Sequence, residues 1–494
     1  MKKQYLFILL LSGTLNLLQA QAFYKNSFTL QNTDKIPSDQ LYGNGIVDVL
    51  VQGDIIWVAT GYGLNRGEYD EMNGDWLWKN FRAKQYGGKG GVSAMGLMGD
   101  SLLWIATAFD TTVRKGTDDE ADLPAGSGLS YTRDGGATWT HIPQPVDDKD
   151  APYAPTTTTV QNLIYDMAFV GNTVWIASFG GGLRRSDDLG KTWQVVTTDS
   201  LMFSSAANLN HRAFSLLSVN DTLWVGTADG ISKSPDNGLS WQRFKFNPQD
   251  STTISGNFIV ALAYQPSQNT VWAATIEAVK EGEFRAVSRT ADGGKTWQRL
   301  LGREQLFTHN FAFDDEHIFL PADKGLYFSA DNGESWEVLK TLQDRESGNE
   351  ILHEEYYSVA VQSAPPGKRL WLGASDGLAT TLLDGPLSTR EWTILRSYVS
   401  TKVRKKPKIY AYPSPFSPSR HLYIRFEFDG TKQLDGPIKI YDFAMDEVAK
   451  IYSEELKPKW DGKNASGDVV ASGVYFFRAK VGGKVTWGKI VVIN

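Results

Sequence analysis

Thr132-Arg133-Asp134-Gly135-Gly136-Ala137-Thr138-Trp139 is one of five segments that share the pattern Ser/Thr-x-Asp-x-Gly-x-Thr/Ser-Trp. The other four run from Ser186 to Trp193, Ser234 to Trp241, Thr290 to Trp297 and Ser329 to Trp336. We call each copy an Asp box. The Asp carboxylate can accept N–H groups of its own turn, the glycine permits a positive φ, and the tryptophan can anchor a hairpin. Traces of the pattern remain around Trp76 and Trp78, and around Asp384 with Trp392.

The Asp boxes are predicted to be structural. Chemistry needs one site, whereas a repeated fold needs the same turn in every repeat, so no catalytic role is expected for these aspartates. The residues given this structural role are Asp134, Trp139, Asp188, Trp193, Asp236, Trp241, Asp292, Trp297, Asp331 and Trp336.

A second repeat has an aromatic residue at the centre of a short apolar strand that ends in a small residue. Its central residues are Trp57, Trp104, Trp175, Trp224, Trp272, Phe319 and Trp371. They are 47, 71, 49, 48, 47 and 52 residues apart, which is the period of a four-stranded propeller blade. Each copy follows a β-rich run and a tight turn, and most copies are followed by a glycine turn and a third strand. The sequence therefore predicts an all-β protein with a seven-bladed β-propeller over residues 45–400.

The Asp boxes resemble the BNR repeats of sialidase-like propellers. A sialidase would need an arginine cluster for the sugar carboxylate, a tyrosine nucleophile and, in that family, an Arg-Ile-Pro motif before the first blade. This chain has Lys35-Ile36-Pro37 instead, and lysine cannot reproduce the planar fork of arginine. The resemblance therefore implies the fold and gives little support to sialidase activity.

The longer connections are expected on the face opposite the Asp boxes. They run over 108–125, 143–160, 197–212, 244–256, 276–285 and 339–355. Because binding residues concentrate in such loops, we expect binding on this long-loop face. Two of these loops are acidic, Asp118 to Asp122 and Asp147 to Asp150, so calcium is conceivable there. Neither matches a known calcium loop, so solvated acidic loops are the favoured interpretation and no metal site is predicted.

A small or polar residue recurs in the first strand of most blades, and this position is expected to line the central channel. The residues are Asp48, Ser93, Asp166, Ser215, Asn310 and Ser358. Hydrogen bonds between blades are the favoured explanation, and ligand binding is the alternative. Asp48 and Asp166 are the carboxylates to test first if the channel is functional.

The period stops at a basic linker, residues 401–409, and a different domain is predicted over 410–494. Short alternating strands in this segment predict a β-sandwich. Tyr412-Pro413-Ser414-Pro415-Phe416, Trp460-Asp461-Gly462 and Ser472-Gly473-Val474-Tyr475 resemble motifs in the Ig-like domain of the flagellar hook-capping family. The ending, residues 488–494, is similar to type IX secretion sorting domains of Bacteroidetes-like bacteria. The resemblance implies contact with a secretion machinery.

Residues 1–22 have the basic start, apolar run and small-residue cleavage site of a signal peptide. Residues 23–44 are expected to pack on the propeller, where 23–30 either add an edge strand or cover the ring joint. No later stretch is long enough for a transmembrane helix. The protein is therefore predicted to be secreted or displayed on the surface of a Gram-negative bacterium, with the periplasm as a stage in transit.

The composition excludes several functions. A net charge of −6 argues against nucleic acid as a partner. The absence of cysteine rules out disulfides and a thiol nucleophile, and no Gly-x-Ser-x-Gly elbow or phosphate-binding loop occurs. The six histidines lack metal-ligand spacing apart from His309 and His317, which flank a turn. No cofactor is predicted.

From these observations we expect a non-catalytic module that binds a protein or a polysaccharide on the long-loop face. The alternative is a glycoside hydrolase, sialidase-like or of another propeller type, with its active site on the same face.

Overall fold

The computed structural model describes residues 41–72, 75–115, 119–344, 349–351, 353–364, 367–384, 387, 390–397, 409–428, 434–452, 458–481 and 483–494. The predicted signal peptide, Lys35-Ile36-Pro37, residues 23–40 and the basic linker up to residue 408 lie outside these ranges. By contacts the chain forms two units. The first holds the described residues up to Thr341 with Leu352–Arg390 and Leu395–Ser397, and the second holds Leu342–Ile351, Glu391–Ile394 and Tyr398–Asn494.

Seven four-stranded antiparallel sheets follow one another along the described chain from Ile46 to Leu395. The first three are β1 (Ile46–Gln52), β2 (Ile55–Thr60), β3 (Gly63–Asp70) and β4 (Asp75–Phe81); β5 (Gly91–Met98), β6 (Leu102–Lys115), β7 (Asp119–Thr132) and β8 (Thr140–Ile142); and β9 (Ile164–Val170), β10 (Thr173–Ser178), β11 (Gly182–Ser186) and β12 (Gln194–Val196). The fourth and fifth are β13 (Ala213–Val219), β14 (Thr222–Thr227), β15 (Gly230–Ser234) and β16 (Gln242–Phe244); and β17 (Phe258–Gln265), β18 (Thr270–Ile276), β19 (Ala286–Thr290) and β20 (Gln298–Leu300). The last two are β21 (Ala312–Asp314), β22 (His317–Ala322), β23 (Gly325–Ser329) and β24 (Glu337–Leu339); and β27 (Tyr356–Ala364), β28 (Gly367–Ala374), β29 (Gly377–Leu382) and β30 (Thr393–Leu395). The helical elements that the structure describes are short: α2 (Ala83–Tyr86), η1 (Leu209–His211) and η2 (Pro266–Gln268).

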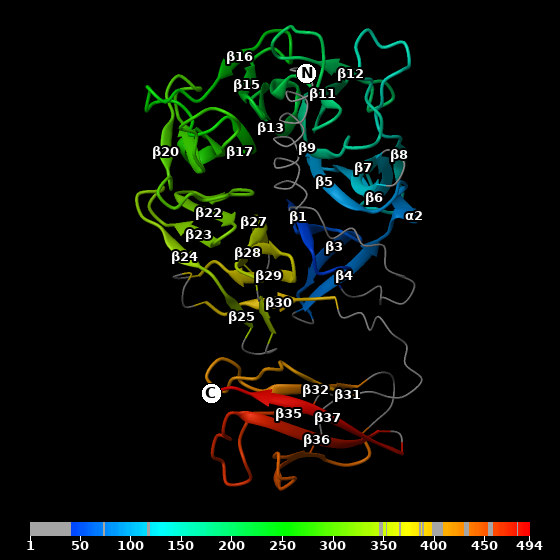
Figure 1. Cartoon of the computed structure of the whole chain (residues 1–494), viewed down its shortest axis with the longest axis vertical. Helices are drawn as coiled ribbons and strands as arrows, with labels where there is room; N and C mark the ends of the chain where they lie inside the picture. Colours follow the sequence, from blue (N-terminus) through cyan, green and yellow to red (C-terminus); the bar gives the residue numbers. More distant parts are fainter. Residues whose placement is uncertain are drawn as a thin grey trace. The chain divides into compact units, whose positions relative to one another are not determined.

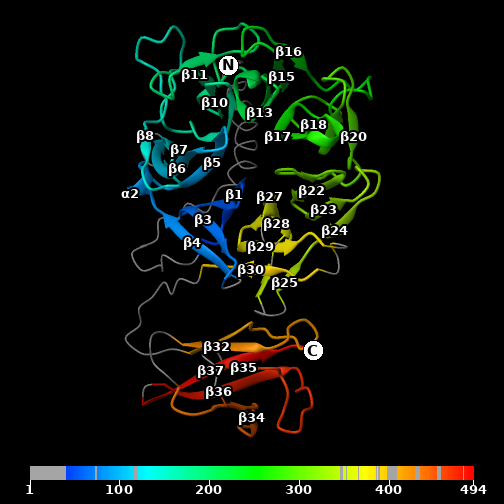
Figure 2. The ribbon, with the colours of Figure 1, turned by 180° about the vertical axis from the view of Figure 1, so that it is seen from behind.

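The sheets are arranged radially about a common axis, with the first strand of each sheet innermost (Figures 1 and 2). This is the arrangement of a β-propeller. The apolar clusters lie between successive sheets: one of them joins Ala168 and Trp175 of the third sheet to Leu216 and Val225 of the fourth. The tryptophans of the second strands are the anchors of these layers, and Trp57, Trp104, Trp175, Trp272 and Trp371 are all fully buried.

The first and seventh sheets meet without exchanging a strand, since every sheet is built from four consecutive strands. β1 lies beside β27. The Val49 amide donates to Ser358 Oγ at 3.0 Å, and Gln362 Nε2 donates to the Gly53 carbonyl at 3.1 Å. Trp76 packs edge-on against Trp371 with 4.6 Å between the ring centroids. Side-chain contacts between these two sheets therefore close the ring.

Each Asp box closes the turn between the third and fourth strands of its sheet by the same hydrogen bonds. In the third sheet, Asp188 Oδ1 accepts from Ser186 Oγ at 2.8 Å and from the Thr192 amide at 2.9 Å. Asp188 Oδ2 accepts from Thr192 Oγ1 at 2.7 Å. Gly190 has a φ of +83° and packs so closely on Ile142 that a Cβ would lie 2.6 Å from its Cδ1 atom, which explains the glycine.

Residues 108–125, predicted as a loop, are mostly strand. β6 and β7 remain paired from Ala108 opposite Gly126 out to Lys115 opposite Asp119. The reason is local, because Thr111, Thr112 and Val113 are β-branched and favour an extended backbone. The insertion is therefore a projecting hairpin on the long-loop face.

The second unit contains two further sheets with an apolar core between them. One sheet has the order β31-β32-β35 and the other β34-β33-β36-β37. Their strands are β31 (Ile409–Tyr412), β32 (Ile424–Phe428), β33 (Ile438–Tyr441), β34 (Glu447–Ile451), β35 (Lys459–Trp460), β36 (Gly473–Val481) and β37 (Lys484–Val492). Phe416, Phe426, Trp460 and Phe477 are the large members of the core. A hairpin of β25 (Leu342–Asp344) and β26 (Asn349–Ile351) belongs to the same unit.

Candidate functional site

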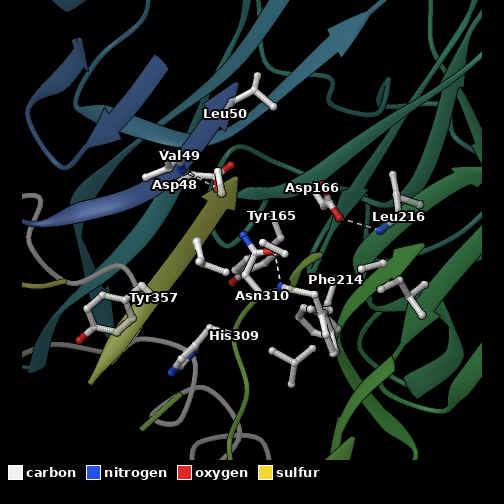
Figure 3. A pocket seen from close by; sticks show the side chains of 18 of the residues that line it. Asp48, Val49, Leu50, Tyr165, Asp166, Phe214, Leu216, His309, Asn310 and Tyr357 are labelled. Atoms are coloured by element: carbon white, nitrogen blue, oxygen red, sulfur yellow. Dashed lines mark hydrogen bonds between the residues drawn. The ribbon is translucent and has the colours of Figure 1, made fainter. Parts of the chain in front are cut away.

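A cavity of about 590 Å³ opens along the axis of the propeller, between the innermost strands (Figure 3). Its walls are mainly apolar and aromatic, with a small number of polar groups. Tyr165, Phe214, Phe258, Phe307 and Tyr357 supply the aromatic surface. Apolar walls with a few polar groups are typical of ligand sites.

β-bulges direct several of these side chains toward the cavity. In six sheets, one residue of the first strand has no partner opposite it in the second strand. These bulged residues are Val47, Ser93, Tyr165, Phe214, Val260 and Tyr357. All six residues line the cavity. A bulge breaks the strict alternation of a strand and re-aims a side chain, so it places aromatic groups at positions that strand periodicity does not reveal.

Of the six positions expected to line the channel, Asp48, Ser93, Asp166 and Asn310 line the cavity, whereas Ser215 and Ser358 are not among its lining residues. Ser93 also departs from the predicted alignment. It is the bulged residue of β5. Ala94, the next residue, is therefore the one that occupies in β5 the position of Asp48 in β1. The sequence alignment was wrong by one residue in this sheet because in β5 the polar residue occupies the bulge itself, whereas in β1 the polar residue, Asp48, follows the bulge.

The six side chains make hydrogen bonds to neighbouring sheets. Asp166 Oδ2 accepts from the Leu216 amide at 2.8 Å, and its Oδ1 accepts from Met167. Ser358 Oγ donates to Asp48 Oδ1 at 2.9 Å, and Asn310 Nδ2 donates to Ser358 Oγ at 3.2 Å. Ser93 Oγ and Ser215 Oγ donate to main-chain oxygens of the following sheets, those of Ile164 and Ile259.

A cluster that the sequence did not single out lies at the rim of the cavity, at the start of the seventh sheet. Tyr357 OH donates to Glu355 Oε2 at 2.9 Å. His309 Nε2 lies 3.8 Å from Glu355 Oε1, and its ring meets that of Tyr357 edge-on at 5.3 Å between centroids. His309 and Tyr357 both line the cavity (Figure 3), so they connect Glu355 to it.

Burial raises the pKa of Glu355, and the negative charge of Asp323 raises it further. The hydrogen bond from Tyr357 and the charge of His353 oppose these effects. Burial lowers the pKa of His309 to about 3, so His309 is neutral at physiological pH and does not form a charged pair with Glu355. A half-buried carboxyl group with a raised pKa is a candidate proton donor.

Asp323 reaches this cluster from the turn between β22 and β23. Its Oδ1 accepts from the Phe307 amide at 3.1 Å, and Phe307 lines the cavity. Glu355 and Asp323 are thus two carboxylates close enough to interact electrostatically, and each contacts a residue that lines the cavity, Tyr357 or Phe307. No sequence spacing indicated this pair, because its members come from different sheets.

The acidic loop at Asp147 is held by an ion pair. Asp147 Oδ1 accepts from Arg184 Nη2 at 2.7 Å and from Tyr153 OH at 2.9 Å, while Oδ2 accepts from the Thr157 amide at 2.7 Å. Both charged side chains are only 4% exposed. In the part of the chain that the structure describes, no three histidine or acidic side chains are grouped as metal ligands would be. Asp147 therefore orders the 143–160 loop through arginine.

The sequence is similar to two curated xyloglucanases. It is 29% identical over 171 residues to a Paenibacillus xyloglucanase, which covers 31% of this chain and 16% of the relative. It is 27% identical over 160 residues to a xyloglucanase of Acetivibrio thermocellus, which covers 29% of this chain and 18% of that protein. The matches span less than a fifth of the length of these relatives. No family model matches the chain.

Two solved structures of GH74 enzymes have a similar fold. The enzyme of Niastella koreensis superposes with a TM-score of 0.50 at 13% identity, over 93% of this chain and 74% of that one. An ancestral GH74 enzyme gives a TM-score of 0.51 at 14% identity, over 92% of this chain and 63% of that one. The chain shares their β-propeller fold.

These similarities correct the functional prediction. The expectation of a non-catalytic binding module is wrong, because the curated proteins that the sequence matches are xyloglucanases, which are enzymes. The alternative considered with it, a glycoside hydrolase, agrees with them.

Within the described residues, no helix is long and apolar enough to cross a membrane.

Proposed function

We propose that this protein is a glycoside hydrolase that cleaves a polysaccharide at the long-loop end of the propeller cavity. The observation that carries the proposal is Glu355, a half-buried carboxyl group with a raised pKa at the rim of an aromatic cavity. Glycoside hydrolysis needs such a proton donor, together with a second carboxylate. The similarity to xyloglucanases supports a β-linked glucan as the first substrate to test.

In this mechanism Glu355 protonates the glycosidic oxygen as the bond to the anomeric carbon breaks. Asp323 has the second role, either activating the attacking water or attacking the anomeric carbon itself. Tyr357 holds Glu355 through its hydroxyl group and fixes the position of the proton donor. The rings of Tyr165, Phe214 and Phe258 offer apolar surface for sugar rings; Phe214 and Phe258 already stack at 4.6 Å.

The test is the release of reducing ends from xyloglucan and a panel of other β-glucans by the full chain. Glu355→Gln should lower kcat by about a hundredfold or more, because amide cannot donate the proton. Glu354→Gln is the matched control: this neighbour is half exposed and lies 3.5 Å from Lys340 on the surface. No hydrolysis by the wild-type chain, or equal rates for Glu355→Gln and wild type, would overturn the proposal.

We further propose that the seven sheets are the seven blades of one sialidase-like ring, with the Asp boxes as structural turns. The recurrence of the same hydrogen bonds in five turns supports this assignment. We also propose that the second unit is an Ig-like domain that directs export and surface attachment. Removal of residues 410–494 should retain the protein in the periplasm, and normal surface display of the truncated chain would refute the assignment.

A further inference from the structure

One sheet of the second unit carries three aromatic and three basic residues in direct register on a single face. Across β33, β36 and β37, one row is Lys439, Arg478 and Trp487, and the next is Tyr441, Phe476 and Lys489. Residues directly opposite one another in a sheet point to the same side. We call these six residues the aromatic–basic face.

This face lies on the outer side of its sheet. The residues next to them in the strands, Ile440, Phe477, Ala479 and Ile490, belong to the apolar core. Trp487 is 48% exposed although it is a large aromatic residue. Its ring lies 5.4 Å from that of Tyr441, with 39° between the planes, so the two rings form one shallow, angled platform. The strands β36 and β37 that carry much of it are the red pair in Figure 1.

The charge on this face is predominantly positive. Glu447 on β34 is paired with Lys439 at 2.8 Å and with Lys450 at 3.0 Å. Among the described residues, Arg478, Lys480 and Lys489 have no carboxylate within ion-pair distance. An aromatic platform with unneutralised cations beside it on a chain of net charge −6 is a local feature that general surface composition does not explain.

We infer that the aromatic–basic face binds an anionic polysaccharide, one that bears carboxylate or sulfate groups. Aromatic faces carry negative partial charge and attract the C–H groups of sugar rings, while lysine and arginine pair with the acidic substituents. Neighbouring strands lie about 4.8 Å apart, and each of the three strands contributes one ring and one cation, so a polysaccharide chain that crosses the strands meets both kinds of group. The inference goes beyond the proposed hydrolysis and does not depend on Glu355.

The same combination of rings and cations also suits single-stranded nucleic acid, which must be distinguished by experiment. The net negative charge of the chain disfavours that ligand. A neutral glucan would use the rings but not the cations. Polysaccharide with acidic groups is the ligand that uses both the rings and the two cations, Arg478 and Lys489, that have no carboxylate partner among the described residues.

The experiment measures binding of the full chain to alginate, to neutral xyloglucan and to a single-stranded DNA oligonucleotide by affinity electrophoresis. Alginate should retard the wild type most, and the effect should weaken with salt. Trp487→Ala and Lys489→Gln should each weaken alginate binding about tenfold, since one aromatic or charged contact contributes roughly that factor. Leu422→Ala is the control, because this exposed apolar residue precedes β32, in the other sheet of the unit.

Unchanged alginate binding by Trp487→Ala, with the same thermal midpoint as the wild type, would overturn the inference. So would binding of DNA or neutral xyloglucan as tight as that of alginate. Hydrolytic activity measured on the same variants separates the two proposals, because loss of Trp487 should leave the turnover of short soluble substrates unchanged, whereas Glu355→Gln should leave alginate binding unchanged.

Discussion

The guanidinium group of Arg185 lies over the ring of Trp175, 5.4 Å from its centroid, and Nη1 donates to the main-chain oxygen of Asn237 at 3.1 Å. Arg185 and Trp175 are directly opposite each other in β11 and β10, whereas Asn237 belongs to the Asp box of the next sheet. The arrangement recurs in the next two sheets. Lys233 lies over Trp224 and donates to the main-chain oxygen of Gly293. Arg289 lies over Trp272 and donates to that of Asn332. A cation that caps the tryptophan of one sheet thus binds the Asp-box turn of the next.

Arg185→Met should therefore weaken the contact between the third and fourth sheets. It keeps the apolar stem but removes the cation, its hydrogen bond to Asn237 and its ion pair with the exposed Asp187, and we expect a loss of about 2 kcal/mol in the free energy of unfolding. Urea denaturation followed by tryptophan fluorescence measures it. Arg303→Met, at an exposed loop position, is the control. Equal denaturation midpoints for the two variants would show that the contact contributes nothing.

Arg184→Met should destabilise the 143–160 loop more strongly, because it leaves the Asp147 carboxylate buried without its cation. Removing one partner of a buried ion pair costs about 3 kcal/mol or more. Urea denaturation and tryptic cleavage after Lys149, which is exposed in this loop, report the effect. Lys340→Met breaks an ion pair whose side chains are 61% and 50% exposed, and it should change little. Equal resistance to trypsin in both variants would contradict the prediction.

The Asp boxes should make the stability of the folded protein depend on pH in the acidic range. Hydrogen bonds from Thr192 and Ser186 lower the pKa of Asp188 to about 2, from an ordinary value of 3.8. A lowered pKa in the folded state contributes stability above the unfolded pKa, and this contribution is lost as pH falls toward 2. Asp188→Asn should lower the thermal midpoint at pH 7. Between pH 4 and 2 the midpoint of this variant should decrease less than that of the wild type. The control is Asp54→Asn, at an exposed turn; identical pH profiles for both variants would exclude the effect.

The pH dependence of hydrolysis should follow Glu355. Because the pKa of Glu355 is raised, the group stays protonated to higher pH than an ordinary glutamic acid, and kcat/KM should fall as pH rises through that pKa. The hydrogen bond from Tyr357 lowers this pKa, so Tyr357→Phe should move the alkaline limb of the profile to higher pH. A shift to lower pH, or no shift with unchanged folding, would remove Glu355 from the role of proton donor.

Repetition made the fold predictable from the sequence. The Asp boxes and the tryptophan strands are local patterns, and each turn is closed by residues within a few positions of each other, as Ser186, Asp188 and Thr192 are. The projecting hairpin of β6 and β7 was missed because its length and acidic tip resembled a loop, although its β-branched residues were a usable signal. Ser93 was misaligned because it occupies the bulge of β5, one position before Ala94, and the sequence does not show where the bulge lies.

The sequence by itself determined the repeated sheets, their turns and the position of the first strands around an axis, because these depend on short-range hydrogen bonds and on a fixed period. Only the tertiary structure decided the candidate site. Glu355 lies just before β27, and Tyr357 is the second residue of that strand, but His309 and Asp323 come from the preceding sheet. The bulges determine which rings face the cavity. Ring closure brings Ser358 to Asp48 across 310 residues, a proximity that only the complete circle of sheets creates.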